Sequence, residues 1–95
     1  MSTPLTITPG HLPGGAPVLK ITGEIDMSNS KMLASALKDV RDRLVIDLTD
    51  VEYLDSAGLN ILFAHADHIE LITNTLLSSV LEMSGLPDLV TIHTG

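Results

Sequence analysis

The feature that most constrains the fold is the segment from Leu44 to Ala66, in which a strand pattern passes directly into a helix pattern. Leu44 to Leu48 is nearly continuous in apolar residues, which predicts a central strand covered on both faces. An acidic loop follows, and Asp55-Ser56-Ala57-Gly58 then opens an apolar helix. A central strand that leads into a helix in this way is typical of an α/β sheet.

Strand and helix patterns alternate along the rest of the chain as well. Short strands are predicted at Leu5–Thr8 and Pro17–Gly23, joined by the turn-rich loop Pro9–Gly15. Further strands are predicted at His68–Thr73 and Leu89–His93. The parallel pairs would be joined by crossovers, and the opening hairpin would add an antiparallel pair. We therefore expect one small domain over residues 1–95 with a mixed, largely parallel sheet.

Apolar periodicity places helices between these strands. The first is expected after an N-cap at Ser28 or Ser30, and the last after an N-cap at Asn74 and before Gly85 and Pro87. The first helix would bury Leu33, Leu37 and Val40, widened by Met32 and Ala36, and the last would bury Leu76, Leu77, Val80, Leu81 and Met83. Asp47 interrupts the central strand, and we expect it to have a structural role.

Composition excludes several classes of function. Twelve acidic and five basic residues give a net charge of −7, so no basic patch for nucleic acid is expected. No run approaches the roughly 18 apolar residues of a membrane helix, and no signal peptide is evident. The absence of cysteine fits a reducing compartment. We expect a cytoplasmic protein without a membrane span, a cofactor or a metal.

Ser56 stands where a helix begins, which allows two interpretations. Unpaired backbone N–H groups and the positive end of the helix dipole gather there, so in the first interpretation Ser56 or Asp55 is only an N-cap worth about 1 kcal/mol. Alternatively, the Ser56 hydroxyl is a phosphorylation site, because the same helix end tolerates a phosphate. Gly58 is expected to permit a close approach of the backbone.

The helix that follows Ser56 is apolar on both sides. Its core stripe is predicted to comprise Leu59, Leu62, Phe63 and Ala66. The opposite face would hold small and apolar residues, namely Ala57, Asn60, Ile61, Ala64 and His65. An exposed face of this kind is a reasonable footprint for a protein partner, although deeper burial of the whole helix would explain it equally well.

Three segments together resemble the STAS domain family, which includes bacterial anti-sigma factor antagonists and the cytoplasmic tails of sulfate transporters. The segments are Gly23-Glu24-Ile25-Asp26, Asp55-Ser56-Ala57-Gly58-Leu59 within Leu44 to Leu62, and Val80 to Leu86. The resemblance implies a four- to five-stranded sheet with helices mainly on one face. It also implies that Asp26 borders the partner surface; a turn-forming aspartate is the alternative interpretation.

The same resemblance implies a non-catalytic function as an anti-sigma factor antagonist. The unmodified protein would bind an anti-sigma factor and release a sigma factor. The anti-sigma factor would also be the serine kinase that phosphorylates Ser56, and a phosphatase would reverse the modification. Asp26, Asp55, Ala57, Asn60, Ile61 and Ala64 are the expected partner-binding residues. The alternatives are a scaffold, a transporter-associated regulatory module, or a small nucleotide-binding protein.

One departure from the family concerns the segment between Gly58 and Thr75, which is shorter than usual by roughly two helical turns. Either the helix after Ser56 is truncated, or His68–Thr73 is not a full strand. His65 and His68 also lie in this segment, but without a third clear ligand they favour surface histidines over a metal site. No converging set of an acid, a base and a metal site points to an enzyme.

Overall fold

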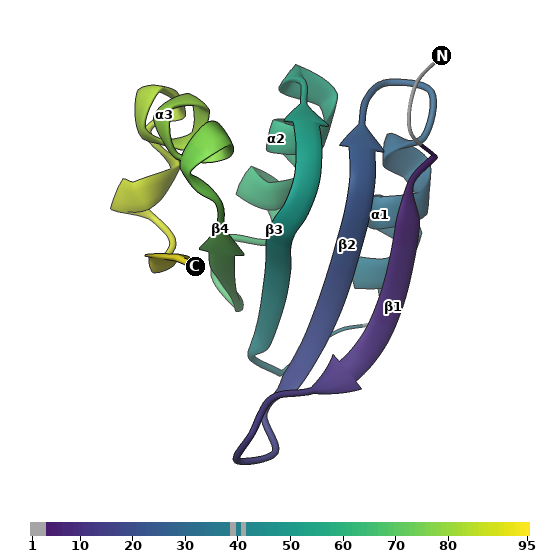
Figure 1. Cartoon of the computed structure of the whole chain (residues 1–95), viewed down its shortest axis with the longest axis vertical. Helices are drawn as coiled ribbons and strands as arrows, with labels where there is room; N and C mark the ends of the chain where they lie inside the picture. Colours follow the sequence, from purple (N-terminus) through teal and green to yellow (C-terminus); the bar gives the residue numbers. More distant parts are fainter. Residues whose placement is uncertain (1–3, 39, 41) are drawn as a thin grey trace.

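The apolar run at Leu44 becomes the middle strand of a twisted sheet (Figure 1). The computed structural model describes residues 4–38, 40 and 42–95, and within them the sheet has five strands in the order β1-β2-β3-β4-β5. β1 is antiparallel to β2, and the remaining neighbours are parallel. The predicted α/β class and mixed, largely parallel sheet are therefore confirmed.

The helices and strands follow the predicted order, but several boundaries differ. β3 continues to Leu54 through the segment predicted as an acidic loop, and β5 begins at Ile92 and not at Leu89. The elements are β1 (Thr6–His11), β2 (Pro17–Ile25), α1 (Ser30–Leu37), β3 (Leu44–Leu54), α2 (Ser56–Ala64), β4 (Ile69–Thr73), α3 (Thr75–Ser84), the 3-10 helix η1 (Leu86–Asp88) and β5 (Ile92–Thr94). The opening strand is longer than predicted, because Pro9 to His11 still pair with β2.

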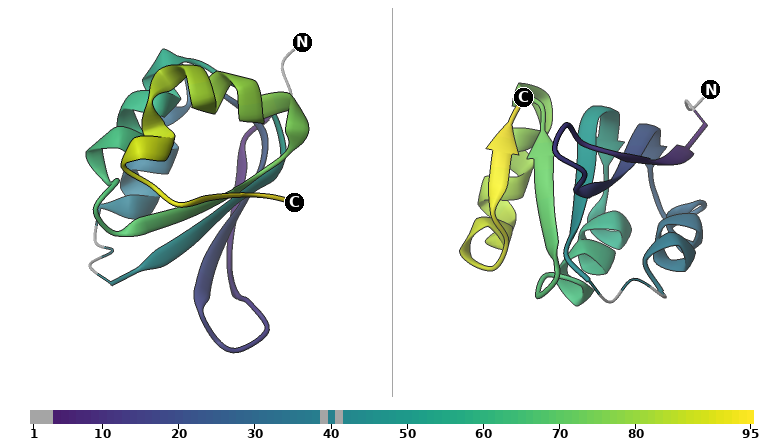
Figure 2. Two further views of the ribbon diagram at one scale, coloured as in Figure 1. Left: turned by 90° about the vertical axis from the view of Figure 1, so that its left-hand side faces the viewer. Right: turned by 90° about the horizontal axis from the view of Figure 1, so that it is seen from below.

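The core lies between the sheet and its helices. Figures 1 and 2 show α1 and α2 side by side on one face of the sheet. Buried side chains of α3 join the same apolar cluster, so all of these helices share one core with the sheet. In β2, Leu19 and Ile21 are buried while Lys20 is exposed, as the predicted alternation requires.

Two helices bury fewer residues than their sequences predict. On α3 only Leu77 and Leu81 are buried, whereas three residues predicted to face inward are exposed: Leu76 at 66%, Val80 at 40% and Met83 at 89%. On α1, Met32 is also exposed at 50%. Each helix rests on the sheet from one side only, so a narrow stripe suffices for the contact and the remaining apolar residues face outward.

β3 is irregular where it passes the middle of β2. It advances from Asp47 to Asp50 while β2 advances only from Lys20 to Thr22, and a second shift follows after Gly23. Gly23 has a φ of 96°, a conformation that favours glycine. Asp47 supports the first irregularity, because its Oδ1 accepts hydrogen bonds from the backbone N (2.9 Å) and the hydroxyl (2.6 Å) of Thr49. The expected structural role of Asp47 is thus explained.

Asn74 connects β3 to α3. β4 pairs with β3 only as far as Asp47, so the later carbonyl groups of β3 on that side lack a strand partner. The Asn74 side-chain amide donates to the carbonyl oxygens of Thr49 (3.0 Å) and Val51 (2.9 Å). Its Oδ1 accepts from the backbone N of Leu77 (2.8 Å), which makes Asn74 the predicted N-cap of α3.

The short stretch between Gly58 and Thr75 contains both the end of α2 and the whole of β4. α2 ends at Ala64 and β4 begins at Ile69, and the turn between them is fixed by a hydrogen bond from the backbone N of Leu44 to the carbonyl of His68 (2.9 Å). The strand therefore forms at nearly its predicted length and α2 is short. His65 and His68 contact each other, and the described residues hold no group of metal-binding side chains. No described helix is long and apolar enough to cross a membrane.

Candidate functional site

The site lies at the carboxyl ends of β2 and β3, where β3 passes into α2. Asp55 is the N-cap of α2, with extended backbone angles of φ −96° and ψ −176°. Its Oδ1 accepts hydrogen bonds from the backbone N of Ala57 (2.9 Å) and of Gly58 (3.2 Å). Asp55 therefore satisfies two of the N–H groups that a helix leaves unpaired at its start.

Ser56 is the first residue of α2, one position after the N-cap. The contacts of its side chain show whether its hydroxyl helps to cap the helix. The side chain is exposed, and it makes no hydrogen bond to any residue that the structure describes. Capping belongs to Asp55, so the Ser56 hydroxyl is not needed to hold the helix end together.

A second carboxylate oxygen of Asp55 joins the start of α2 to the turn between β2 and α1. Asp55 Oδ2 accepts a hydrogen bond from the backbone N of Met27 (3.1 Å). The backbone N of Asp55 in turn donates to the carbonyl of Ile25 (3.1 Å). The Ser56 region and the Asp26 region, which are distant in the sequence, thus form one surface.

The turn that carries Asp26 is built from its own polar side chains. Asp26 Oδ1 accepts from the backbone N (2.9 Å) and the hydroxyl (2.5 Å) of Ser28. Asn29 Oδ1 accepts from the backbone N of Asp26 (3.0 Å), and its amide donates to the carbonyl of Glu24 (2.8 Å). The predicted N-cap at Ser28 or Ser30 is wrong: Asn29 occupies that position, and these bonds leave α1 without a side-chain cap.

The pKa of Asp26 offers a test of this turn. The Ser28 hydroxyl, followed by the Ser28 backbone N–H, lowers the pKa of Asp26 below its usual value. Because the folded-state pKa is depressed, the carboxylate contributes to stability above the unfolded pKa, and this contribution is lost as the pH falls through the folded value. Ser28→Ala should move the pKa of Asp26 upward in an NMR titration of the carboxyl carbon. An unchanged titration would contradict the hydrogen bond to the hydroxyl.

The faces of α2 differ in part from the prediction. Gly58 and Leu62 are buried, while Leu59 and Phe63 pack only partly against the core. Ile61 was expected on the outer face but is half-buried and packs against the same core. The core-facing side thus includes Gly58, where an added Cβ would overlap the side chains of Leu54 and Ile25.

The outward side of α2 is a line of short side chains. Ser56, Asn60 and Ala64 are exposed and follow one another at intervals that place them on one helix face. Ala57 and Asp55 are half-buried at the start of the helix, and Asp26 is half-buried on the adjoining turn. We call the surface made by Asp26, Asp55, Ser56, Asn60 and Ala64 the α2 surface.

Two features of this region were not predicted from the sequence. The first is that the apolar side chain of Met27 is exposed at 80%, which the sequence did not predict. Its position between Asp26 and Ser28, which are both turn-forming residues, is the signal that would have placed it at a turn apex. The second is how little space surrounds Gly58. A close approach of the backbone was expected there, but an added Cβ would lie only 2.4 Å from Leu54 Cδ1 and 2.7 Å from Ile25 Cγ2.

Comparison with known proteins identifies relatives of this architecture. Residues 11–91 match the family model described as "Mlab, STAS domain". The anti-sigma-F factor antagonist RsfB of two Mycobacterium tuberculosis strains is 44% identical over a match that covers 58% of this chain and 48% of the relative. The match thus spans about half of the length of RsfB.

Solved structures agree with the family match. The crystal structure of an anti-sigma factor antagonist from Mycobacterium paratuberculosis superposes with a TM-score of 0.82 at 27% identity, covering 95% of this chain and 86% of that one. An antisigma-factor antagonist STAS domain from Rhodobacter sphaeroides shares the fold alone, with a TM-score of 0.53, 16% identity and coverage of 73% of this chain and 84% of that one. The five-stranded sheet topology agrees with the match over residues 11–91, and the chain belongs to the STAS domain family.

Proposed function

We propose that this protein is an anti-sigma factor antagonist whose binding is switched off by phosphorylation of Ser56. The unmodified protein binds an anti-sigma factor in the cytoplasm and thereby releases a sigma factor. The anti-sigma factor acts as the serine kinase, and a phosphatase restores the binding form. The observation that carries the proposal is the exposed Ser56 hydroxyl, without a hydrogen-bond partner among the described residues, at the first position of α2.

The arrangement of Asp55 supports a switch that changes the surface and not the fold. A phosphate adds about −1.5 to −2 charges and strong acceptor oxygens. The backbone N–H groups of Ala57 and Gly58 already donate to Asp55, so they are not available to draw the phosphate into the helix end. The new charge therefore stays at the surface beside the Asp55 and Asp26 carboxylates, where an arriving partner meets it.

The shape of the α2 surface supports the same role. The exposed side chains of Ser56, Asn60 and Ala64 are short, so a partner can approach the helix backbone closely. A contact that close excludes water, and a phosphate placed within it must be desolvated or must displace the partner. The protein acts here as a binding module, and the proposal assigns it no reaction of its own.

The test compares variants of Ser56 in titrations with a purified anti-sigma factor. Ser56→Ala should bind like the wild type, whereas Ser56→Glu should bind at least about 30-fold more weakly, since an unpaired charge in an interface costs about 2 kcal/mol or more. Ser79→Glu is the matched control, because Ser79 is an exposed serine on α3 and the substitution adds the same charge.

A phosphorylation assay completes the test. With ATP and the anti-sigma factor, labelling of the wild type should disappear in Ser56→Ala, and phosphatase treatment of the labelled protein should restore binding. Equal affinities for the wild type, Ser56→Ala and Ser56→Glu would refute the switch. Labelling that persists in Ser56→Ala would place the modified residue elsewhere.

A further inference from the structure

We infer that Met27, next to Asp26 on the turn between β2 and α1, is an apolar contact residue for the same partner. The inference rests on the proposed function and names the chemistry of the partner: a pocket that accepts a methionine side chain and is bordered by basic groups.

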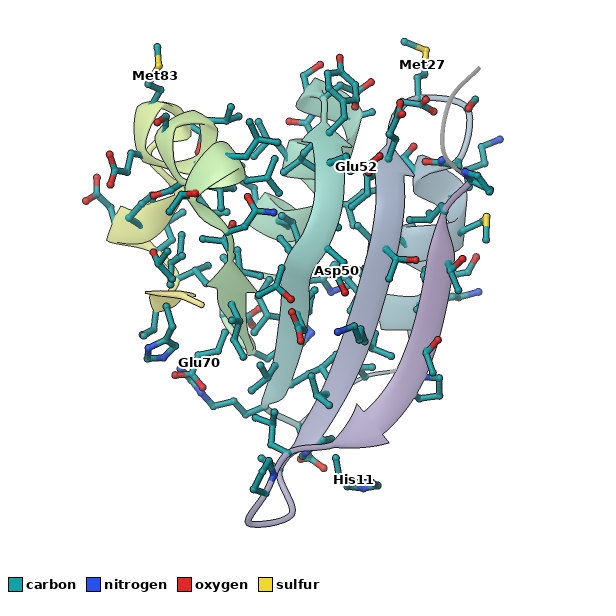
Figure 3. All side chains as sticks on the ribbon, viewed as in Figure 1. His11, Met27, Asp50, Glu52, Glu70 and Met83 are labelled. Atoms are coloured by element: carbon teal, nitrogen blue, oxygen red, sulfur yellow. The ribbon has the colours of Figure 1, made fainter. Side chains whose placement is uncertain are left out.

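Met27 is displayed prominently for an apolar residue. Its side chain is exposed at 80%, and Figure 3 shows it projecting from the end of the molecule at which β2 and β3 terminate. A single exposed apolar side chain is common on protein surfaces and needs no explanation by itself. Met27 differs from such a residue in its position, because it is next to Asp26 and its backbone N donates a hydrogen bond to Asp55.

The turn that presents Met27 is held on both sides. Asp26 binds Ser28 through a backbone and a side-chain hydrogen bond, and Asn29 binds the backbone N of Asp26. The backbone N of Met27 itself is bound by Asp55. A backbone fixed in this way loses little conformational entropy on binding, while the flexible methionine side chain adapts to the shape of a partner pocket.

Asp55 places Met27 and Ser56 on one continuous surface. Its Oδ2 accepts from Met27 N at 3.1 Å, its Oδ1 accepts from Ala57 N at 2.9 Å, and Ser56 is its neighbour in the chain. A partner that covers Met27 therefore reaches the edge of the α2 surface. A phosphate on Ser56 would stand beside this contact, so loss of the Met27 contact would accompany the switch.

The charges around Met27 define the border of the partner pocket. Asp26 and Asp55 lie just beyond the ends of β2 and β3. The matching partner surface is basic around an apolar centre, and association should weaken as salt is added.

The test compares two exposed methionines. Met27→Ala should lower the affinity of the unphosphorylated protein for the anti-sigma factor about tenfold, as expected for truncation of an important interface residue. Met83→Ala is the matched control: Met83 is exposed at 89% on α3, and Figure 3 places it at the opposite upper corner from Met27. It should leave the affinity unchanged, and both variants should keep the wild-type melting temperature.

A second variant checks that the apolar volume matters. Met27→Leu should retain most of the affinity, whereas Met27→Ala should not. If the wild type binds and responds to Ser56→Glu but Met27→Ala binds equally well, this inference fails and the proposed function stands. Equal losses in Met27→Ala and Met83→Ala would also overturn it, because the effect would not be local. If the wild type binds no anti-sigma factor, both fail together.

Discussion

Asn74→Ala should lower the free energy of unfolding by about 3 kcal/mol, because one side chain performs two structural tasks. Its Oδ1 caps α3 through Leu77 N, and loss of such a cap costs about 1 kcal/mol. Its amide also donates to the carbonyl groups of Thr49 and Val51, at about 1 kcal/mol for each hydrogen bond. The measurement is urea denaturation followed by circular dichroism, which suits a chain without tryptophan.

Asn74→Ser separates the two tasks. Serine caps a helix about as well as asparagine but is too short to replace the amide, so this variant should lose about 2 kcal/mol. A loss this large is a substantial share of the roughly 5 to 14 kcal/mol expected for a domain of this size. If Asn74→Ser were as stable as the wild type, the bonds to β3 would contribute nothing and the estimate would be wrong.

Gly58→Ala should destabilise the domain by about 2 kcal/mol. The new Cβ would meet Leu54 Cδ1 at 2.4 Å and Ile25 Cγ2 at 2.7 Å, and both side chains are buried. Overpacking of this kind costs about 1–3 kcal/mol, and so severe an overlap belongs at the upper end. The better helix propensity of alanine returns up to about 1 kcal/mol, which is too little to reverse the sign.

Gly10→Ala is the control for this prediction. A Cβ at Gly10 would meet only Val18 Cγ1 at 3.7 Å, an ordinary contact, so the free energy of unfolding of the Gly10→Ala protein should change by less than about 0.5 kcal/mol.

Gly58→Ala should also weaken partner binding, because the first turn of α2 must move away from the sheet and carries Ser56 with it. A Gly58→Ala protein as stable as the wild type would show that the helix can shift without cost.

The sequence predicted those parts of the fold that local chemistry determines. Asn74 and Gly85 mark the ends of α3 because an N-cap and a left-handed glycine serve these positions almost regardless of context. Which apolar residues of α3 face the core was not predictable in the same way. Leu76, Val80 and Met83 are as apolar as Leu77 and Leu81, so only the position of the sheet decides between them.

The candidate site shows the same division. Its location at the start of α2 follows from the Asp55-Ser56-Ala57-Gly58 pattern, and the structure assigns the cap to Asp55 and leaves Ser56 exposed. Both residue types are good N-caps, so the sequence left the choice open. The hydrogen bond from Met27 to Asp55 joins segments 28 residues apart, and no local pattern encodes such a contact.

The strand order has a consequence for how the chain reaches this structure. Neighbours in the sheet are neighbours in the sequence, from β1 through β5. No strand has to enter between two strands that are already paired, and each new strand adds to an existing edge. We therefore expect the sheet to grow in the direction of synthesis, starting from the β1–β2 hairpin, with each crossover helix closing its own part of the core.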